Sequence, residues 1–326
     1  MTSAASAKPA VSRPRPNRAR SVGATLLAMV FGAMLAGQAR VNGALGEQLG
    51  DGYLAALLSF VVSVLCTLAV LPFWRPGQAG IRALIRAVGA RQIPWWHLAG
   101  GAAGALFVVA QSLTAAVLGV AMFTVASVSG QTIGGLVIDR TGFGSMPPTR
   151  LTWPRLTGSA LALVAVVVAV SPQLQGDIPF WMLALPLVAG FGAGFQQAAN
   201  GEVREASGSA HTAGLVSGVV GTAVLAVVVA GGLVITGPPP ALPSDWWLYT
   251  GGLLGALFIA GGALVVRFTG VLLLGLGMIA GQLLASLVLD ILLPTTDEPV
   301  HPVTVLGTVL TLIAVVVAAI PARARR

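Results

Sequence analysis

Charged side chains are scarce in this chain of 326 residues. Asp, Glu, Lys and Arg together make up 9% of it, whereas hydrophobic residues make up 56%. An average soluble domain carries about 25% charged residues. The chain therefore has too few charges to cover the surface of a soluble domain of its length, and its composition indicates a protein embedded in a membrane.

Cysteine and histidine are scarce as well. Cys66 is the only cysteine, which excludes an internal disulfide, and the three histidines lie far apart in the sequence. No spacing typical of a metal site results. Paired carboxylates, or a nucleophile with a base, are also missing from the loops near the membrane. We therefore expect no enzyme, no catalytic residue, no cofactor and no bound metal.

Acidic residues are fewer than basic ones, 10 against 18, which gives a formal net charge of +8. Nucleic-acid-binding proteins often carry such an excess, but they gather it on one surface. In this chain the basic residues are scattered along the ends of apolar segments. We therefore expect no nucleic-acid partner.

Long apolar segments fill most of the chain. A helix needs about 20 mostly apolar residues to cross a bilayer, and many of the prolines lie at segment ends, where they do not break a helix. The ten segments cover residues 22–42, 53–73, 97–117, 120–138, 154–171, 180–200, 212–236, 247–266, 270–293 and 303–321. The expected fold class is an all-α polytopic membrane protein with ten transmembrane helices.

The basic residues indicate the orientation of these segments. If the N-terminus is cytoplasmic, all of the 18 Lys and Arg residues except Arg40 fall in cytoplasmic stretches. Cytoplasmic loops of membrane proteins collect Lys and Arg. We therefore expect both termini to be cytoplasmic, with a disordered basic tail at residues 1–20 and a basic C-terminus at residues 322–326.

The second half of the chain repeats the first. One block of residues returns after 151 positions and an upstream block after 158 positions. The matching blocks include Trp95-Trp96 with Trp246-Trp247, Gly100-Gly101 with Gly251-Gly252, Asp139 with Asp290, and Ser59 with Ser217. We expect two five-helix repeats at residues 21–172 and 179–321. Since each has an odd number of spans, the repeats are inverted, which is a recurring architecture of secondary transporters.

A Gln-x3-Asn-Gly pattern lies near the end of the first apolar segment of each half. Its residues are Gln38, Asn42 and Gly43 in the first half and Gln196, Asn200 and Gly201 in the second. Together with Ser59, Ser217, Gly130-Gln131 and Gly281-Gln282, the pattern resembles the YdcZ family of the drug/metabolite transporter superfamily. The resemblance extends over nearly the whole chain after residue 20.

This resemblance implies a multi-pass protein of the bacterial plasma (inner) membrane. It would export a small metabolite or drug-like molecule, with the substrate unknown, by alternating access of the two repeats in the lipid bilayer. The alternative is a lipid flippase or scramblase, because the polar groups of the spans are few and mostly amides. Many relatives resemble a single five-helix unit that pairs as a dimer. This chain resembles the fused form, and a homodimer is left open.

The smallest relatives in the superfamily carry a membrane-embedded Glu in their first helix, as proton and substrate site. The corresponding helix of this chain has Gln38 and Asn42 instead, which argues against simple proton antiport. The two residues share one helix face, as do Gln196 and Asn200. Both pairs either flank the substrate path at opposite gates or cap helices that end at the Asn-Gly step.

Gln131 and Gln282 lie near the middle of their segments. An amide at that depth needs a hydrogen-bond partner, because hydrocarbon offers none. Either the two line a shared cavity at the centre of the bilayer or each joins neighbouring helices. Gln111 adds polarity to the first half alone, since Gly262 stands at the matching position.

Glu47 and Glu205 are the only glutamates that recur between the halves. Both lie beyond the expected ends of their helices. They are either gating or ion-coupling groups or solvated acids in loops.

Overall fold

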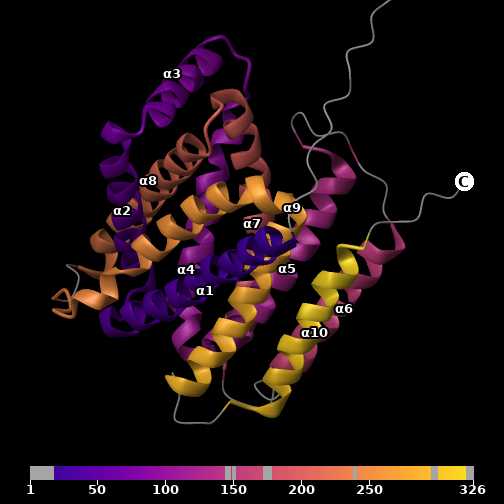
Figure 1. The fold of residues 1–326 in the computed structure, drawn as a ribbon. Helices are drawn as coiled ribbons and strands as arrows, with labels where there is room; N and C mark the ends of the chain where they lie inside the picture. The colour runs from indigo at the N-terminus through magenta and orange to yellow at the C-terminus, as the bar shows by residue number, and fades with distance from the viewer. Residues whose placement is uncertain are drawn as a thin grey trace, which may run out of the picture.

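The computed structural model describes residues 18–143, 148, 152–171, 178–237, 241–294 and 300–320. Its helices are α1 (Arg18–Leu49), α2 (Gly52–Val70), α3 (Arg75–Gly89), α4 (Gly100–Leu118), α5 (Val120–Thr141), α6 (Trp153–Val170), α7 (Phe180–Ser207), α8 (Ala210–Thr236), α9 (Gly251–Leu292) and α10 (Pro302–Ala318). Short 3-10 turns η1 (Leu71–Phe73), η2 (Trp95–Ala99) and η4 (Trp246–Tyr249) lie between them. The helices form one bundle, with α6 and α10 side by side at its edge (Figure 1).

The helices confirm an all-α polytopic membrane protein. Seven helical stretches of the described residues are long and apolar enough to cross a membrane, and three shorter apolar stretches accompany them, with α9 contributing one stretch of each kind. Each of these ten corresponds to one of the segments expected from the sequence. The expected tail at residues 1–20 lies outside the described residues except for Arg18–Arg20, which already belong to α1, and residues 322–326 lie outside them entirely.

Helix α3 was not expected from the sequence, because the stretch after the second apolar segment is rich in arginine. One face of α3 is buried, at Gly77, Gly80, Leu84 and Ala87, which is the spacing of an amphipathic helix. This face packs against α7 and α8. A scan for helical periodicity between the spans could have found it.

The chain turns between the eighth and ninth expected segments without leaving the helical conformation. The sequence predicted separate helices on either side of residues 266–270, but α9 is continuous over 42 residues. Phe31 contacts the first arm of α9 at Gly261, and the adjacent Gly32 contacts the second arm at Met278. Both arms therefore reach α1, and Figure 1 shows the bend between them.

The turn between α4 and α5 matches the bend of α9, but here the chain leaves the helical conformation, and Asp290 explains the difference. Gly119 separates α4 from α5 with a φ of 82°, a backbone angle that glycine tolerates. The Asp290 carboxylate accepts hydrogen bonds from the amides of Val120 (2.9 Å) and Ala121 (2.6 Å) at the start of α5. Asp139, its counterpart, instead pairs with Arg155 at 2.7 Å, so α9 has no equivalent carboxylate to cap a second start.

Corresponding helices of the two halves run antiparallel. Along α2 and α8, Phe60 meets Gly221 and Val64 meets Gly218. The end of α2 leads into α3, which contacts the beginning of α8, where Thr212 donates a hydrogen bond to the Gly77 carbonyl (3.3 Å). Along α6 and α10, Gly158 meets Ala318 and Gly307 meets Ala169. The two repeats are therefore inverted, as expected from the odd number of spans.

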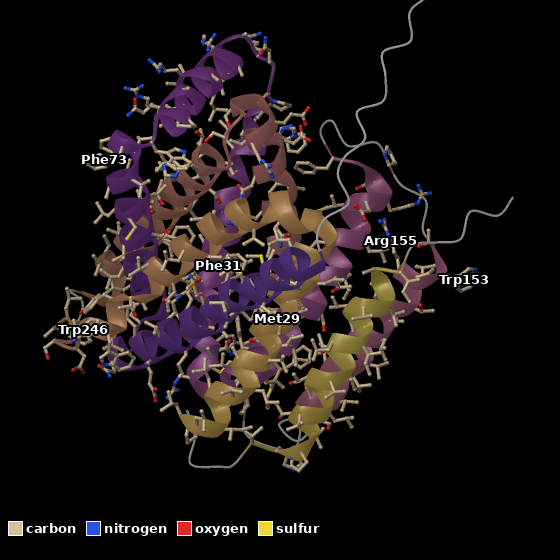
Figure 2. The ribbon with its side chains drawn as sticks, in the orientation of Figure 1. Met29, Phe31, Phe73, Trp153, Arg155 and Trp246 are labelled. Carbon is tan, nitrogen blue, oxygen red and sulfur yellow. The ribbon has the colours of Figure 1, made fainter. Side chains whose placement is uncertain are left out.

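The first helix of each half packs against helices three and four of the other half. Helix α1 lies along α9, while α7 lies against α4 and α5. In each symmetry-related pair a glycine touches a main-chain carbonyl: Gly32 with Met278 and Gly190 with Ser127, then Gly281 with Met29 and Gly130 with Leu187. Figure 2 shows Met29 and Phe31 on α1 near the centre of the view, where this helix crosses α9. The halves are thus interlocked rather than merely adjacent.

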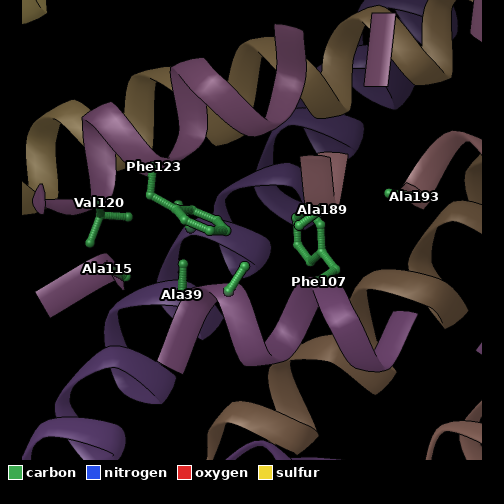
Figure 3. Close-up of a cluster of buried hydrophobic side chains, with 9 residues drawn as sticks. Ala39, Phe107, Ala115, Val120, Phe123, Ala189 and Ala193 are labelled. Carbon is green, nitrogen blue, oxygen red and sulfur yellow. The ribbon is translucent and has the colours of Figure 1, made fainter. Parts of the chain in front are cut away.

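An apolar cluster occupies the centre of this interlocked arrangement (Figure 3). Its two phenylalanines, Phe107 of α4 and Phe123 of α5, meet edge to face with ring centroids 5.7 Å apart. The other members are small or short: Ala36, Ala39, Ala110, Ala115, Val120, Ala189 and Ala193. Because α1, α4, α5 and α7 all contribute, the cluster belongs to both halves.

The glycine contacts predict a position-specific sensitivity to alanine. A Cβ at Gly130 or Gly281 would overlap a main-chain carbonyl, which cannot move without shifting a helix, so each Ala variant should lose about 1–3 kcal/mol of stability. Gly135 and Gly275 are matched controls with no atom near the added Cβ. Their Ala variants should be neutral or stabilised by about 0.5–1 kcal/mol. Thermal unfolding in detergent measures the difference, and equal midpoints for all four variants would contradict the described packing.

Removal of the Asp290 charge should also destabilise the bundle. Asp290→Asn loses the negative charge at the α5 N-terminus, and we expect a cost of about 1–2 kcal/mol. Asp139→Asn is the matched control, because the Asp139–Arg155 pair is partly exposed and such pairs contribute about 0–1 kcal/mol. Thermal unfolding of both variants beside the wild type is the measurement. If Asp139→Asn lost as much stability as Asp290→Asn, the contact of Asp290 with the start of α5 would not be the cause of the loss.

Candidate functional site

The structure brings Asn42 of α1 and Gln111 of α4 together. The Asn42 Nδ2 donates a hydrogen bond to Gln111 Oε1 at 2.8 Å, and neither side chain is accessible to solvent. Gln38, one turn before Asn42, lies with its amide against Gly255 of α9. Ser59 of α2 lies beside Asn42 at Gly251. We call Gln38, Asn42, Ser59 and Gln111 the amide cluster.

Three buried polar atoms of the amide cluster lack a hydrogen-bond partner among the described residues. They are Asn42 Oδ1, Ser59 Oγ and Gln111 Nε2. Each such buried atom costs about 1–3 kcal/mol when left unpaired. The set combines an acceptor, a donor and a hydroxyl that can act as either. It can therefore bind a ligand that carries both polar donors and acceptors, and it needs no charge on that ligand.

Neither Asn-Gly step ends a helix, so the capping interpretation was wrong. Helix α1 continues past Asn42 to Leu49, and α7 continues past Asn200 to Ser207. Gly43 packs against the backbone of Ala115 and Ala116, where a larger residue would not fit. The glycine thus serves a close approach of α1 and α4 rather than a turn.

The second Gln-x3-Asn pair lies at the matching contact of the other half. Gln196 Nε2 donates a hydrogen bond to Ser217 Oγ at 3.0 Å, and the Gln196 amide lies against Gly104 of α4. Asn200 lies half-buried beside Gly100. Both Gln-x3-Asn pairs therefore face the Gly-Gly-x2-Gly stretch of the opposite half.

A second amide cluster does not form at this end, because the matching position to Gln111 is Gly262. Among the described residues Asn200 consequently has no hydrogen bond to a glutamine, and it is half-buried instead of fully buried. The extra polarity of Gln111, visible in the sequence, thus creates a site in one half only.

Gln131 and Gln282 are not joined by any hydrogen bond of the described residues. Gln131 is half-exposed and accepts a 3.4 Å bond from Gln197 of α7. Gln282 is 3% exposed, and its Nε2 has no partner within the described part of the chain. The difference between Gln131 and Gln282 follows from the repeat. At the position of α1 that matches Gln197 of α7 stands Ala39, which cannot donate a side-chain hydrogen bond to Gln282. Gln131 therefore connects two helices, while Gln282 remains a candidate for the substrate path.

Glu47 and Glu205 are both exposed. They lie on the last turns of α1 and α7 rather than in loops beyond them, which corrects the expected position. Glu205 lines a shallow surface depression with Gly201, Arg204 and Gly208. A gating or coupling role for the two glutamates stays a prediction, as does self-association of the chain.

Sequence comparison places these features in a family. One solved crystal structure is similar over 93% of this chain and 97% of its own, with a TM-score of 0.50 at 18% identity, which supports the fold alone. No curated protein matches the chain. The family described as "Putative inner membrane exporter, YdcZ" matches twice, at residues 23–168 and 181–317. These two matches correspond to the two inverted repeats, and the chain belongs to the YdcZ family of inner-membrane exporters.

Proposed function

We propose that the protein is a secondary transporter that exports a small polar molecule by alternating access of its two halves. The observation that carries the proposal is the amide cluster. Its side chains come from α1, α2 and α4 of the first half, and the Gly251 and Gly255 backbone of the second half lies against them. A site built across two interlocked halves changes when one half moves relative to the other.

The chemistry of the site favours an uncharged or weakly charged substrate. Asn42, Gln111 and Gln282 present amide atoms without partners among the described residues, and the amide cluster contains no ionisable side chain. Hydrogen bonds of this kind contribute about 0.6 to 1.7 kcal/mol each inside membrane proteins. Several together give selectivity while still allowing release on the far side. A small metabolite or drug-like molecule with amide, hydroxyl or carbonyl groups fits these donors and acceptors.

The test compares metabolites inside and outside cells that lack the protein, express it, or express Asn42→Ala/Gln111→Ala. We expect a metabolite that the wild type moves outward, and a loss of at least about tenfold in its export rate with the double variant, the size that loss of one or two such hydrogen bonds predicts. Gln48→Ala, an exposed amide on the same helix, should export normally. Untargeted mass spectrometry and matched protein amounts on blots give the measurement.

Three outcomes separate the alternatives. Export that survives Asn42→Ala/Gln111→Ala removes the amide cluster from the substrate path but keeps the transporter. Movement of a fluorescent phospholipid in proteoliposomes, with no metabolite shift in cells, replaces the proposal by a lipid flippase or scramblase. Absence of both movements rejects transport.

We also propose that both termini face the cytoplasm. The support is the distribution of arginines together with the fold, in which Phe73 and Trp246 lie toward opposite ends of the bundle (Figure 2). In a Cys66→Ala background, a membrane-impermeant maleimide applied to intact cells should label Asp245→Cys and leave Gln92→Cys unlabelled. Both positions are exposed. The opposite labelling pattern would reverse the orientation.

A further inference from the structure

His97 is buried at the contact between the two halves. It lies in η2, directly before α4, and is 2% exposed. Its Nδ1 is 3.9 Å from Glu202 Oε2 of α7, and neither ring nitrogen has a hydrogen-bond partner among the described residues. A buried imidazole normally donates or accepts at least one hydrogen bond. The pair thus stands slightly too far apart for a hydrogen bond, and the imidazole is buried without one.

Aromatic rings surround the imidazole. Trp96 meets it edge to face at a centroid distance of 4.0 Å, and Phe143 stacks on it at 5.0 Å. Phe195 of α7 extends the group by an edge contact with Phe143. A buried cation is costly unless a carboxylate pairs with it closely, and aromatic faces favour a cation. At 3.9 Å the Glu202 carboxylate does not pair closely with the ring, so burial favours the neutral imidazole, and a proton on His97 is held better once this end opens and water reaches the ring.

The matching position in the other half is apolar. The repeat aligns His97 with Leu248 and Glu202 with Ala44. Leu248 is fully buried and packs with Leu45, Leu49 and Ala44. One end of the interlocked bundle is therefore closed by apolar packing that does not depend on protons, while the other end carries a protonatable pair.

The other charged and titratable side chains around this end are more exposed than His97. Those on the neighbouring elements are Arg82 and Arg86 of α3, Arg91 after it, Arg140 at the end of α5, and Arg204 and Glu205 of α7, all of them exposed. His211 of α8 is half-buried and lies against Gly77 of α3. Glu202 is thus the acidic group within ion-pair distance of His97 in the described part of the chain.

We propose that His97 and Glu202 form a proton-binding site between η2 and α7, so that proton binding favours opening of this end of the bundle. The inference rests on the proposed alternating access, because only a protein whose two ends open in turn can use such a site for coupling or regulation. In the proposed orientation this end faces the cytoplasm. Protonation would open the cytoplasmic side and favour the inward-open state.

The test measures the opening of this end directly. Nitroxide labels on Gln92→Cys and Gly201→Cys, in the full chain with Cys66→Ala in nanodiscs, report the distance between η2 and α7 by pulsed electron spin resonance. Both labelled positions are exposed, and Gly201 has open space around it. We expect the ratio of short-distance to long-distance populations to be about tenfold lower at pH 5.5 than at pH 8.5, the size of a typical ligand-coupled shift.

Matched variants identify the groups responsible. His97→Leu/Glu202→Ala gives this end the residues found at the other end, and it should hold the short distance at both pH values. His97→Gln alone should remove the pH response even if the double variant folds poorly. His211→Gln, at the half-buried histidine of the same end, should keep the wild-type response. A pH response that persists in His97→Gln, or that disappears in His211→Gln, would overturn the proposal.

Export measured on the same variants separates this inference from the proposed function. If the wild type exports but its label distance does not change with pH, the proton-binding site is wrong and transport stands. If the distance responds to pH through His97 while neither a metabolite nor a lipid moves, the proton-binding site stands and transport is wrong.

Discussion

Direct backbone contact between helices of opposite halves is the constraint on which the structure depends. Inside a bilayer, lipid tails are as apolar as leucine, so helices associate by close packing rather than by the hydrophobic effect. Gly32, Gly130, Gly190 and Gly281 each let a helix touch a main-chain carbonyl of its partner. These contacts interlock the repeats, and both the amide cluster and the His97–Glu202 pair take their positions from the resulting contacts of α1 and α7.

Function enters through departures from the twofold symmetry. The interlocked scaffold repeats almost contact by contact, yet Gln111 is matched by Gly262, Gln197 by Ala39 and His97 by Leu248. At each of these positions one half carries a polar side chain and the matching residue of the other half does not. A perfectly symmetric carrier has two states of equal energy, so such differences are what distinguish inward from outward. The amide cluster and the His97–Glu202 pair lie at different contacts between the halves, where they can favour different states.

Much of the fold could be predicted from the sequence, because spans, prolines and repeats are one-dimensional signals. The ten apolar segments, the inversion and the shared helix face of Gln38 and Asn42 belong to this class. The helix ends at Asn42 and Asn200 were predicted wrongly, since the Asn-Gly signal for a cap is the same as for a close helix approach. The Asn42–Gln111 bond and the Asp290 cap could not be predicted, because they join residues 69 and more positions apart. A comparison of the two repeats for lost symmetry would have identified His97.

The energetics of neutral amides fit the work of a carrier better than charges do. A charged residue held at the centre of a bilayer costs at least about 2.5–3.5 kcal/mol and binds an opposite charge tightly. The amide cluster instead leaves Asn42 Oδ1 and Gln111 Nε2 unpaired among the described residues. Each of these atoms can form a hydrogen bond with water, with a neighbouring amide or with a substrate, and the three kinds of bond have similar energies. Small differences of that kind let a substrate bind on one side and leave on the other. Direction must then come from elsewhere, and a protonatable contact present at only one end of the bundle is the simplest source of it.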